Sequence, residues 1–283
     1  MALVDMKEML QKARREGYAV PAFNITDLQS IQVVVEVCER ENAPCLMEAA
    51  EPTLKTYGPD YLVAMAEVAA RRARVPVAFH LDHGKSFDVI MAGIRAGFTS
   101  VMIDASEKPF AENVAITKRI VDIAHACGVS VEAELGHVGL ADHEPTEEEK
   151  AKFLTDPEEA ARFVELTGVD ALAVAVGTAH GMYKYEPKLD LERLRKIAEV
   201  VPLPLVLHGG SGTPGLELTP PFGISKVNIF TDLQIPIREK AKEILDTIPL
   251  EKLMAPRIWK IANEAAAPVV RDRIRLLGAA GKA

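Results

Sequence analysis

Cysteine, aromatic residues and long apolar runs are all scarce in this chain of 283 residues. The three cysteines, Cys38, Cys45 and Cys127, form neither an even nor a clustered set, so we expect reduced thiols and a cytoplasmic protein. No apolar stretch approaches the roughly 18 to 20 residues that a membrane helix needs, and the charged N-terminus lacks the apolar core of a signal peptide. These absences predict a soluble globular protein with no membrane partner.

Positive charge is also in deficit, because 33 Lys and Arg stand against 41 Asp and Glu and leave a net charge of −8. Nucleic-acid binding needs clustered basic residues, so we expect no nucleic-acid partner, whereas a pocket for a small anion is compatible with the balance. Hydrophobic residues form 48% of the chain, enough for a large core. No shift in composition marks a second domain, and we expect a single domain over 1–283.

Short apolar runs alternate with helical patterns along the whole chain. Strands are expected at 19–23, 44–49, 75–81, 98–103, 129–135, 169–176, 203–208 and 224–230. Helices are expected at 27–41, 57–72, 86–96, 110–127, 157–167, 190–200 and 232–247, with an extra helix at 5–16 and C-terminal helices beyond 248. This unbroken alternation predicts a parallel (β/α)8 TIM barrel. An open doubly wound sheet is the alternative, but no G-x-G-x-x-G follows the first strand.

The longest connection, 136–155, follows the fifth strand and reads GHVGLADHEPTEEEKAKFLT. A connection of this length is usually a functional lid or a disordered segment, and we predict a mobile active-site loop. Its acidic run, 147–149, is expected to form a solvated helix face.

Imidazole side chains follow several strands, at the end of the barrel where active sites lie. His83, His180 and His208 follow three different strands, and three neutral nitrogen ligands with an open fourth position describe a catalytic zinc site. The alternative is that each is a hydrogen-bonded histidine at the start of a loop. His80 precedes its strand end and is expected to pack or to support a ligand.

Carboxylates accompany these histidines. Asp82, beside His83, can take and return a proton, or it can orient a histidine. Asp104 and Glu134, on neighbouring strands, can provide a second cation position, hydrogen-bond the ligand histidines, or form a structural ion pair.

A glycine-rich run, 209–212, follows the seventh strand, and 228–232 follows the eighth. Barrels commonly bind phosphate there through backbone N–H groups, although an ordinary turn is the alternative reading. The sixth strand has no lysine, so a Schiff-base aldolase with its amine there is disfavoured. The one strand lysine, Lys226, lies beside the phosphate region.

These residues resemble the class II, zinc-dependent ketose-bisphosphate aldolases, including the fructose- and tagatose-1,6-bisphosphate enzymes. The similarity covers nearly the whole chain, and HLDHG, GTAHG and HGGSG carry it in this order and spacing. It implies reversible cleavage of a phosphorylated sugar, a ketose 1,6-bisphosphate, to dihydroxyacetone phosphate and glyceraldehyde 3-phosphate through a zinc-stabilised enediolate, in a homodimer or homotetramer. The implied zinc ligands are His83, His180 and His208, with Asp82 as the acid/base and Asp104 and Glu134 at a second or alternative metal position.

The resemblance also implies the substrate contacts. They are Asn24, Gly181, Gly209, Gly210, Ser211, Asn228, Phe230, Thr231, Asp232 and Leu233, with a monovalent cation near the phosphate and Arg257 at a distal phosphate. Two positions depart from the family pattern. Asp142 stands where the mobile loop usually has a catalytic glutamate, with His143 and Glu144 as substitutes, and Phe230 stands where relatives have Asp or Ala. Two further hypotheses therefore remain: an aldolase of the same mechanism for another phosphorylated sugar or sugar acid, and a non-catalytic barrel subunit.

Overall fold

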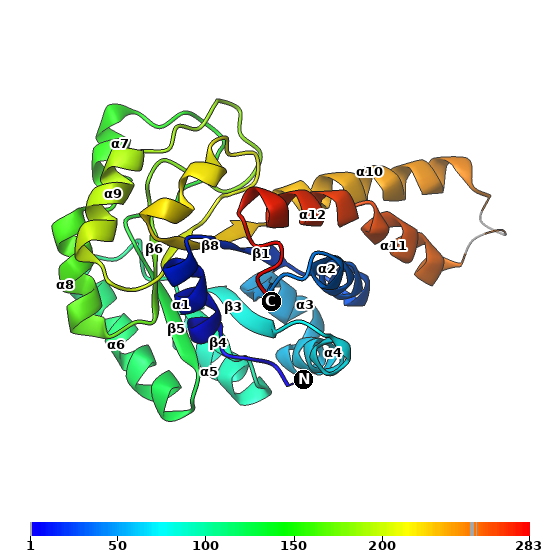
Figure 1. Cartoon of the computed structure of the whole chain (residues 1–283), viewed down its shortest axis with the longest axis horizontal. Helices are drawn as coiled ribbons and strands as arrows, with labels where there is room; N and C mark the ends of the chain where they lie inside the picture. The colour runs from blue at the N-terminus through cyan, green and yellow to red at the C-terminus, as the bar shows by residue number, and fades with distance from the viewer. Residues whose placement is uncertain (1, 250–251, 253) are drawn as a thin grey trace.

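The computed structural model describes residues 2–249, 252 and 254–283, and its strands close into one parallel barrel in chain order (Figure 1). The strands are β1 (Val20–Asn24), β2 (Cys45–Ala50), β3 (Val77–Gly84), β4 (Ser100–Ile103), β5 (Ser130–Leu135), β6 (Ala171–Val174), β7 (Leu205–Leu207) and β8 (Ile224–Ile229). The barrel closes where Val20 of β1 lies opposite Lys226 of β8. The predicted TIM barrel is confirmed, and the doubly wound alternative is wrong.

Helices follow the strands and surround the barrel (Figure 1). They are α1 (Met6–Glu16), α2 (Leu28–Arg40), α3 (Glu51–Tyr57), α4 (Pro59–Arg72), α5 (Phe87–Ala96), α6 (Phe110–Ala126), α7 (Glu147–Phe153), α8 (Pro157–Thr167), α9 (Leu191–Val200), α10 (Thr231–Thr247), α11 (Ala255–Glu264) and α12 (Ala267–Leu276), with 3-10 turns η1 (Leu216–Leu218) and η2 (Pro220–Phe222). The helix expected from residue 57 starts at Pro59, because Gly58, with φ of 82°, separates α4 from the unpredicted α3.

Local signals explain where several helices begin. Asp27 accepts a hydrogen bond from the backbone N–H of Ser30 at 2.7 Å, and Asp156 accepts one from Glu158 at 2.9 Å. Each such cap typically stabilises a helix by about 1 kcal/mol. Within 136–155, which we call the lid, α7 begins with the exposed Glu147, so the acidic run forms a solvated helix face as expected.

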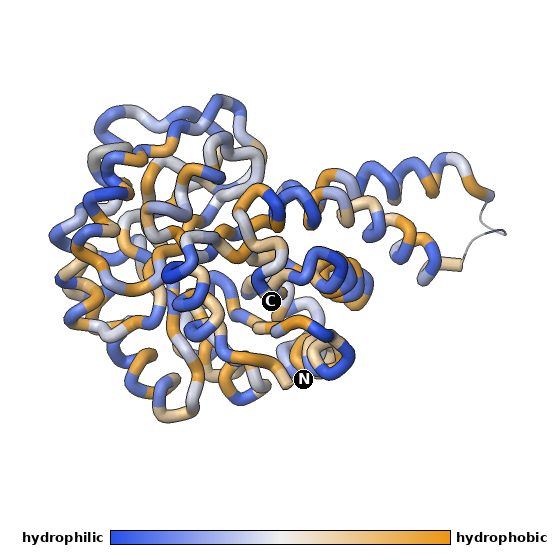
Figure 2. Tube along the Cα trace, in the orientation of Figure 1, coloured by the Kyte–Doolittle hydropathy of each residue, from blue (hydrophilic) through white to orange (hydrophobic). Residues whose placement is uncertain are grey.

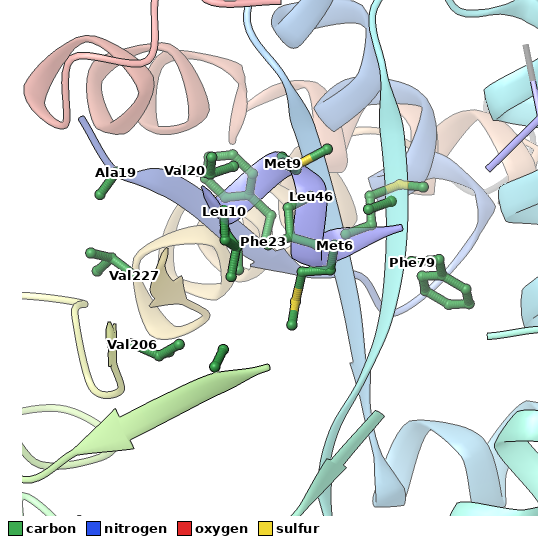
Figure 3. Close-up of a cluster of buried hydrophobic side chains, with 14 of the residues drawn as sticks. Met6, Met9, Leu10, Ala19, Val20, Phe23, Leu46, Phe79, Val206 and Val227 are labelled. Carbon is green, nitrogen blue, oxygen red and sulfur yellow. The ribbon is translucent and has the colours of Figure 1, made fainter. Parts of the chain in front are cut away.

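Helix α1 covers the N-terminal end of the barrel. Ser130, at the start of β5, donates a hydrogen bond to Asp5 at 2.6 Å, just before α1. Met6 and Leu10 of α1 are fully buried and lie near Phe23 (Figure 3). The carboxyl ends of the strands are therefore the open end of the barrel, where a site can form.

Two C-terminal helices leave the barrel. α10 and α11 run side by side away from it as a hairpin, which we call the arm, and apolar residues recur along the arm (Figures 1 and 2). α12 returns to pack against α2 and β1. None of the helices in the described ranges combines the length and the apolar character needed to cross a bilayer.

Candidate active site

The three predicted histidines meet at the carboxyl ends of the strands. One ring nitrogen from each of His83, His180 and His208 lies within 4.8 Å of the other two. The ring centres of His83 and His208 are 4.5 Å apart, and those of His83 and His180 are 4.9 Å apart. β3 changes register between Leu81 and Gly84, and His83 has φ of 47°, a value uncommon outside glycine. Such an irregularity redirects side chains, which accounts for the direction of the His83 side chain toward the other two histidines.

Carboxylates hold two of the imidazoles. His83 Nδ1 lies 2.9 Å from Oδ2 of Asp104, and His208 Nε2 lies 2.9 Å from Oε1 of Glu132. An ionised carboxylate can only accept, so each ring donates from that nitrogen. The other nitrogens, His83 Nε2 and His208 Nδ1, face each other at 2.8 Å in the centre of the cluster.

The backbone of the lid holds the third imidazole. His180 Nδ1 lies 3.1 Å from the carbonyl oxygen of Val138, and the N–H of Ala141 donates to the carbonyl of His180 at 2.9 Å. His180 Nε2 is buried and has no hydrogen-bond partner. A buried ring nitrogen without a partner is costly, and a metal ion at the centre of the cluster would satisfy it. Three imidazole nitrogens form a donor set that suits zinc.

The protonation of the cluster is uneven. Burial and the charge of His83 lower the pKa of His180 to about 4, and burial likewise holds the pKa of His208 well below its usual range. Burial also opposes a charge on His83, but Asp82 and Asp104 raise its pKa to about 10. His180 and His208 are therefore neutral at pH 7, the form that binds a metal.

Asp82 lies beside the cluster and is held from both sides. Asn24 Nδ2 donates to Oδ2 of Asp82 at 2.9 Å, Asn228 Nδ2 donates to Oδ1 at 3.0 Å, and His83 Nε2 lies 3.9 Å from Oδ1. Burial raises the pKa of Asp82, but the nearby imidazoles, a buried lysine and the Asn24 hydrogen bond lower it to about 2. Asp82 is therefore ionised at neutral pH.

Asp104 and Glu134 lie on the other side of His83. Asp104 also accepts a hydrogen bond from the hydroxyl of Ser106 at 2.8 Å, and Glu134 accepts one from the N–H of Val138 at 3.0 Å. Burial opposes ionisation of Asp104, but the adjacent His83 holds the pKa of Asp104 below its usual range. Burial raises the pKa of Glu134 to about 7, and its Oε2 has no partner. Together with His83, the two carboxylates form a second group of close metal-ligating atoms.

The glycine-rich turn lies against the start of α10. Ser211 Oγ accepts hydrogen bonds from the N–H groups of Phe230 at 3.2 Å and Asp232 at 3.1 Å. Gly209 has φ of 67°, and a Cβ there would lie 2.3 Å from the carbonyl oxygen of Ala179. The packing of the turn therefore already requires glycine at 209, so this residue alone does not distinguish a phosphate cradle from an ordinary turn.

The whole chain can be compared with known proteins. Residues 4–282 match the family model for fructose-bisphosphate aldolase class-II. This chain belongs to the class II fructose-bisphosphate aldolase family. Membership makes it a lyase that catalyses aldol cleavage.

Solved structures agree with the family assignment. The YdjI aldolase from Escherichia coli K12 is 33% identical, with a TM-score of 0.87 over 99% of each chain. A candidate fructose-1,6-bisphosphate aldolase from Coccidioides immitis is 28% identical, with a TM-score of 0.86 over 98% of this chain and 97% of that one. The Campylobacter jejuni fructose-bisphosphate aldolase, at 24% identity and a TM-score of 0.85 over 100% of this chain and 97% of that one, supports the fold alone.

The other residues that are expected to contact the substrate differ in their exposure and in their partners. Thr231 starts α10 beside Ser211, and Gly181 follows His180 in an exposed loop. The Asp232 carboxylate instead pairs with Arg273 of α12 at 2.9 Å, and the Leu233 side chain is buried.

Arg257 is not brought to the site within this chain. It is exposed on α11, and α11 belongs to the arm that leads away from the barrel (Figure 1). The expected contact with a distal phosphate therefore does not form within one chain, because the helix that carries Arg257 does not return to the strand ends.

Asp142, the predicted acid of the lid, lies at the surface. Asp142 Oδ1 is 2.8 Å from His143 Nδ1, and the two side chains are 61% and 63% exposed. His143 Nε2 lies 3.4 Å from Glu149, while Glu144 is exposed. A cavity of about 730 Å³ lies under the lid and is lined in part by Asp142 and Arg193. Asp142 thus contacts another lid residue, His143, rather than the histidine cluster.

Two groups that hydrogen-bond the histidine cluster, the Glu132 carboxylate and the Val138 carbonyl, were not predicted from the sequence. Glu132 precedes Glu134 by two residues in β5, and strand alternation places both on the inner face, so this signal was present. The carbonyl of Val138 left no signal, because any residue supplies a backbone oxygen.

Proposed function

We propose that this aldolase reversibly cleaves fructose- or tagatose-1,6-bisphosphate to dihydroxyacetone phosphate and glyceraldehyde 3-phosphate, with zinc held by His83, His180 and His208. One observation carries the proposal: each ring is tethered through one nitrogen, and one nitrogen of each ring lies within 4.8 Å of a nitrogen of the other two. When bound there, zinc supplies Lewis-acid stabilisation of the negative charge that develops on substrate oxygens as the carbon–carbon bond breaks.

Asp82 performs the proton transfer in this proposal. It takes the proton of the C4 hydroxyl in cleavage and returns it in condensation. The amides of Asn24 and Asn228 fix the direction of its carboxylate, and both donate through neutral N–H groups that leave the charge in place. The ionised state of Asp82 at neutral pH supports the role of a base.

The C1 phosphate is proposed to bind at the glycine-rich turn, beside the start of α10. Gly209, Gly210, Ser211 and Thr231 lie there, and the positive end of the helix dipole favours an anion. Anchoring this phosphate would hold the reacting carbons in a fixed position relative to Asp82. A monovalent cation beside the phosphate stays a prediction.

We also propose that 1–283 acts as one domain in which the lid is the mobile part. Asp142, or His143 or Glu144 beside it, would exchange the proton that completes dihydroxyacetone phosphate. This requires movement, because Asp142 is 61% exposed and paired with His143. The group formed by His83, Asp104 and Glu134 supports a second or alternative divalent position as part of the proposal, and the two positions would share His83.

One observation favours a second candidate, an aldolase of the same mechanism for another phosphorylated sugar or sugar acid. Phe230 is 46% exposed beside Ser211, at the start of α10. A phenyl ring there would replace polar contacts to the aldehyde half of the substrate by apolar ones. The close group of three histidines and the hydrogen bond between Asn24 and Asp82 argue against a non-catalytic subunit.

The purified chain tests these proposals. Elemental analysis should find about one zinc ion per chain, and EDTA should abolish cleavage of either bisphosphate. A panel of aldehydes with dihydroxyacetone phosphate then separates the two candidate substrate classes.

Asp82→Ala should lower kcat by about 10²–10⁴-fold and leave the zinc content unchanged, because Asp82 supplies none of the three nitrogens. Asp88→Ala, on the exposed start of α5, serves as the surface control. A metal-free preparation that cleaves at full rate would refute the proposed function.

We further propose that the enzyme works in the cytoplasm as a homodimer or homotetramer. Its cysteines are free thiols, with Cys38 and Cys45 buried and Cys127 exposed, which suits a reducing compartment.

A further inference from the structure

Beneath the histidine cluster, the interior of the barrel contains charged side chains with no exposure to solvent. Lys226 Nζ lies 2.9 Å from Oε2 of Glu132 and 3.2 Å from Oε2 of Glu48. The other oxygen of Glu132, Oε1, lies 2.9 Å from His208 Nε2. All four residues are 0% exposed. The Lys226 ammonium is therefore linked to the His208 imidazole through the carboxylate of Glu132.

Glu132 and Glu48 differ in one respect that matters here. Both are fully buried and both pair with the same ammonium of Lys226. Glu132 also accepts from His208, whereas neither oxygen of Glu48 makes a hydrogen bond. Substitution of these two glutamates therefore separates the effect of pairing with Lys226 from the effect of accepting a hydrogen bond from His208.

We propose that Glu132, fixed by Lys226, is a positioning residue that keeps the proton of His208 on Nε2 and so presents Nδ1 to a divalent metal. Oε1 of Glu132 can only accept, which makes Nε2 the donor, and a neutral imidazole has one N–H. Lys226 occupies Oε2 and prevents the carboxylate from turning away. The inference rests on the metal site of the proposed function.

Glu132→Gln is the variant that tests this role. An amide has a single acceptor oxygen, and the Lys226 ammonium, which has three donors and no acceptor, competes for it. The NH₂ group would then face His208 Nε2 and force the proton onto Nδ1, the nitrogen meant for the metal. We expect the affinity for Co²⁺ or Zn²⁺, measured by chelator competition on the full chain without sugar, to fall about 10–100-fold.

Glu48→Gln is the matched control. It removes the other carboxyl partner of the same lysine in an equally buried place, but it leaves the contact between Glu132 and His208 intact. Its metal affinity should equal that of the wild type. Should Glu132→Gln fail to fold, Glu132→Asp keeps a charge for Lys226, withdraws the oxygen from His208, and should weaken metal binding in the same way.

The double variant Glu132→Gln/Lys226→Met separates positioning from packing. Without the ammonium, the amide oxygen is free to return to His208, so metal affinity should recover. If Glu132 only packs, the second buried substitution would add damage and no recovery would follow. Nitrogen-15 NMR of the metal-free protein should find the His208 proton on Nε2 in the wild type and on Nδ1 in Glu132→Gln.

Three results would overturn the inference: wild-type metal affinity in a folded Glu132→Gln, an equal loss in Glu48→Gln, or a further loss in the double variant. The proposed function fails separately. A chain that follows the expected metal pattern but cleaves no ketose bisphosphate would refute the substrate and leave the role of Glu132 standing. If the chain is an active zinc aldolase but its Glu132→Gln variant keeps full metal affinity, the role of Glu132 is refuted and the proposed function stands.

Discussion

His83 differs from His180 and His208 in its protonation state. Its pKa is raised to about 10, whereas the pKa of His180 is lowered to about 4. The cause is the position of the carboxylates, because Asp82 and Asp104 both lie beside His83. In the metal-free protein at neutral pH, His83 is therefore an imidazolium that donates to both Asp104 and His208.

Metal binding is predicted to expel this proton. A raised pKa means that the proton competes with the metal at every pH below about 10, and the competition weakens as the pH rises. Metal affinity should thus increase by about tenfold per pH unit between pH 7 and 9. Calorimetry in two buffers of different ionisation enthalpy should count about one proton released at pH 7. An affinity that does not change with pH, with no proton released, would contradict this assignment.

At the scale of elements, the lid and the histidine cluster are joined through backbone. Ala141 N–H donates to the carbonyl of His180, and the carbonyl of Val138 accepts from the His180 ring. These bonds fix His180 although it lies in a loop beyond the end of β6. Movement of the lid near residue 141 would therefore disturb one of the proposed zinc ligands.

Ala141→Pro removes the N–H that donates to His180. A lost hydrogen bond of this kind is worth about 1 kcal/mol, so we expect metal affinity to fall by about fivefold. Leu140→Ala is the control, because the Leu140 side chain is 69% exposed and the backbone is unchanged. Chelator competition measures both variants. Equal affinities in Ala141→Pro and the wild type would show that the lid does not hold His180.

Strand and helix order could be predicted from periodicity, because the strands of the barrel are mostly apolar runs that alternate with helical patterns, and some helices carry a start signal, as at Asp27 and Asp156. The three histidines could be predicted because strand ends meet at one rim. The hydrogen bonds that hold the histidine rings could not be predicted. They depend on pairings between distant strands, such as Glu132 with His208, and on a backbone carbonyl at Val138. The place of Arg257 depends on the direction of the arm, which no local pattern determines.

In the molecule as a whole, the arm is the part of the chain that projects from the barrel (Figure 1). It carries exposed apolar side chains, among them Leu245 at 54%, Met254 at 75% and Trp259 at 48% exposure. Exposed apolar groups gathered on a projecting element mark contact surfaces. This supports the homodimer or homotetramer of the proposal.

Trp259→Glu should shift the assembly toward the monomer, because it would place a charge in an apolar contact. Light scattering after size-exclusion chromatography measures the mass of each species. Tyr61→Glu, at an exposed position on α4 of the barrel wall, is the control and should leave the mass unchanged. A wild-type chain that is monomeric at micromolar concentration would refute the proposed assembly.

The central claim is that the three imidazoles hold one metal ion. Diffraction from zinc-loaded crystals at the zinc absorption edge tests it most directly. We predict a strong anomalous peak within bonding distance of His83 Nε2, His180 Nε2 and His208 Nδ1. A peak in the buried group of Glu48, His80 and Asp82 instead, or no peak among the three histidines, would contradict it.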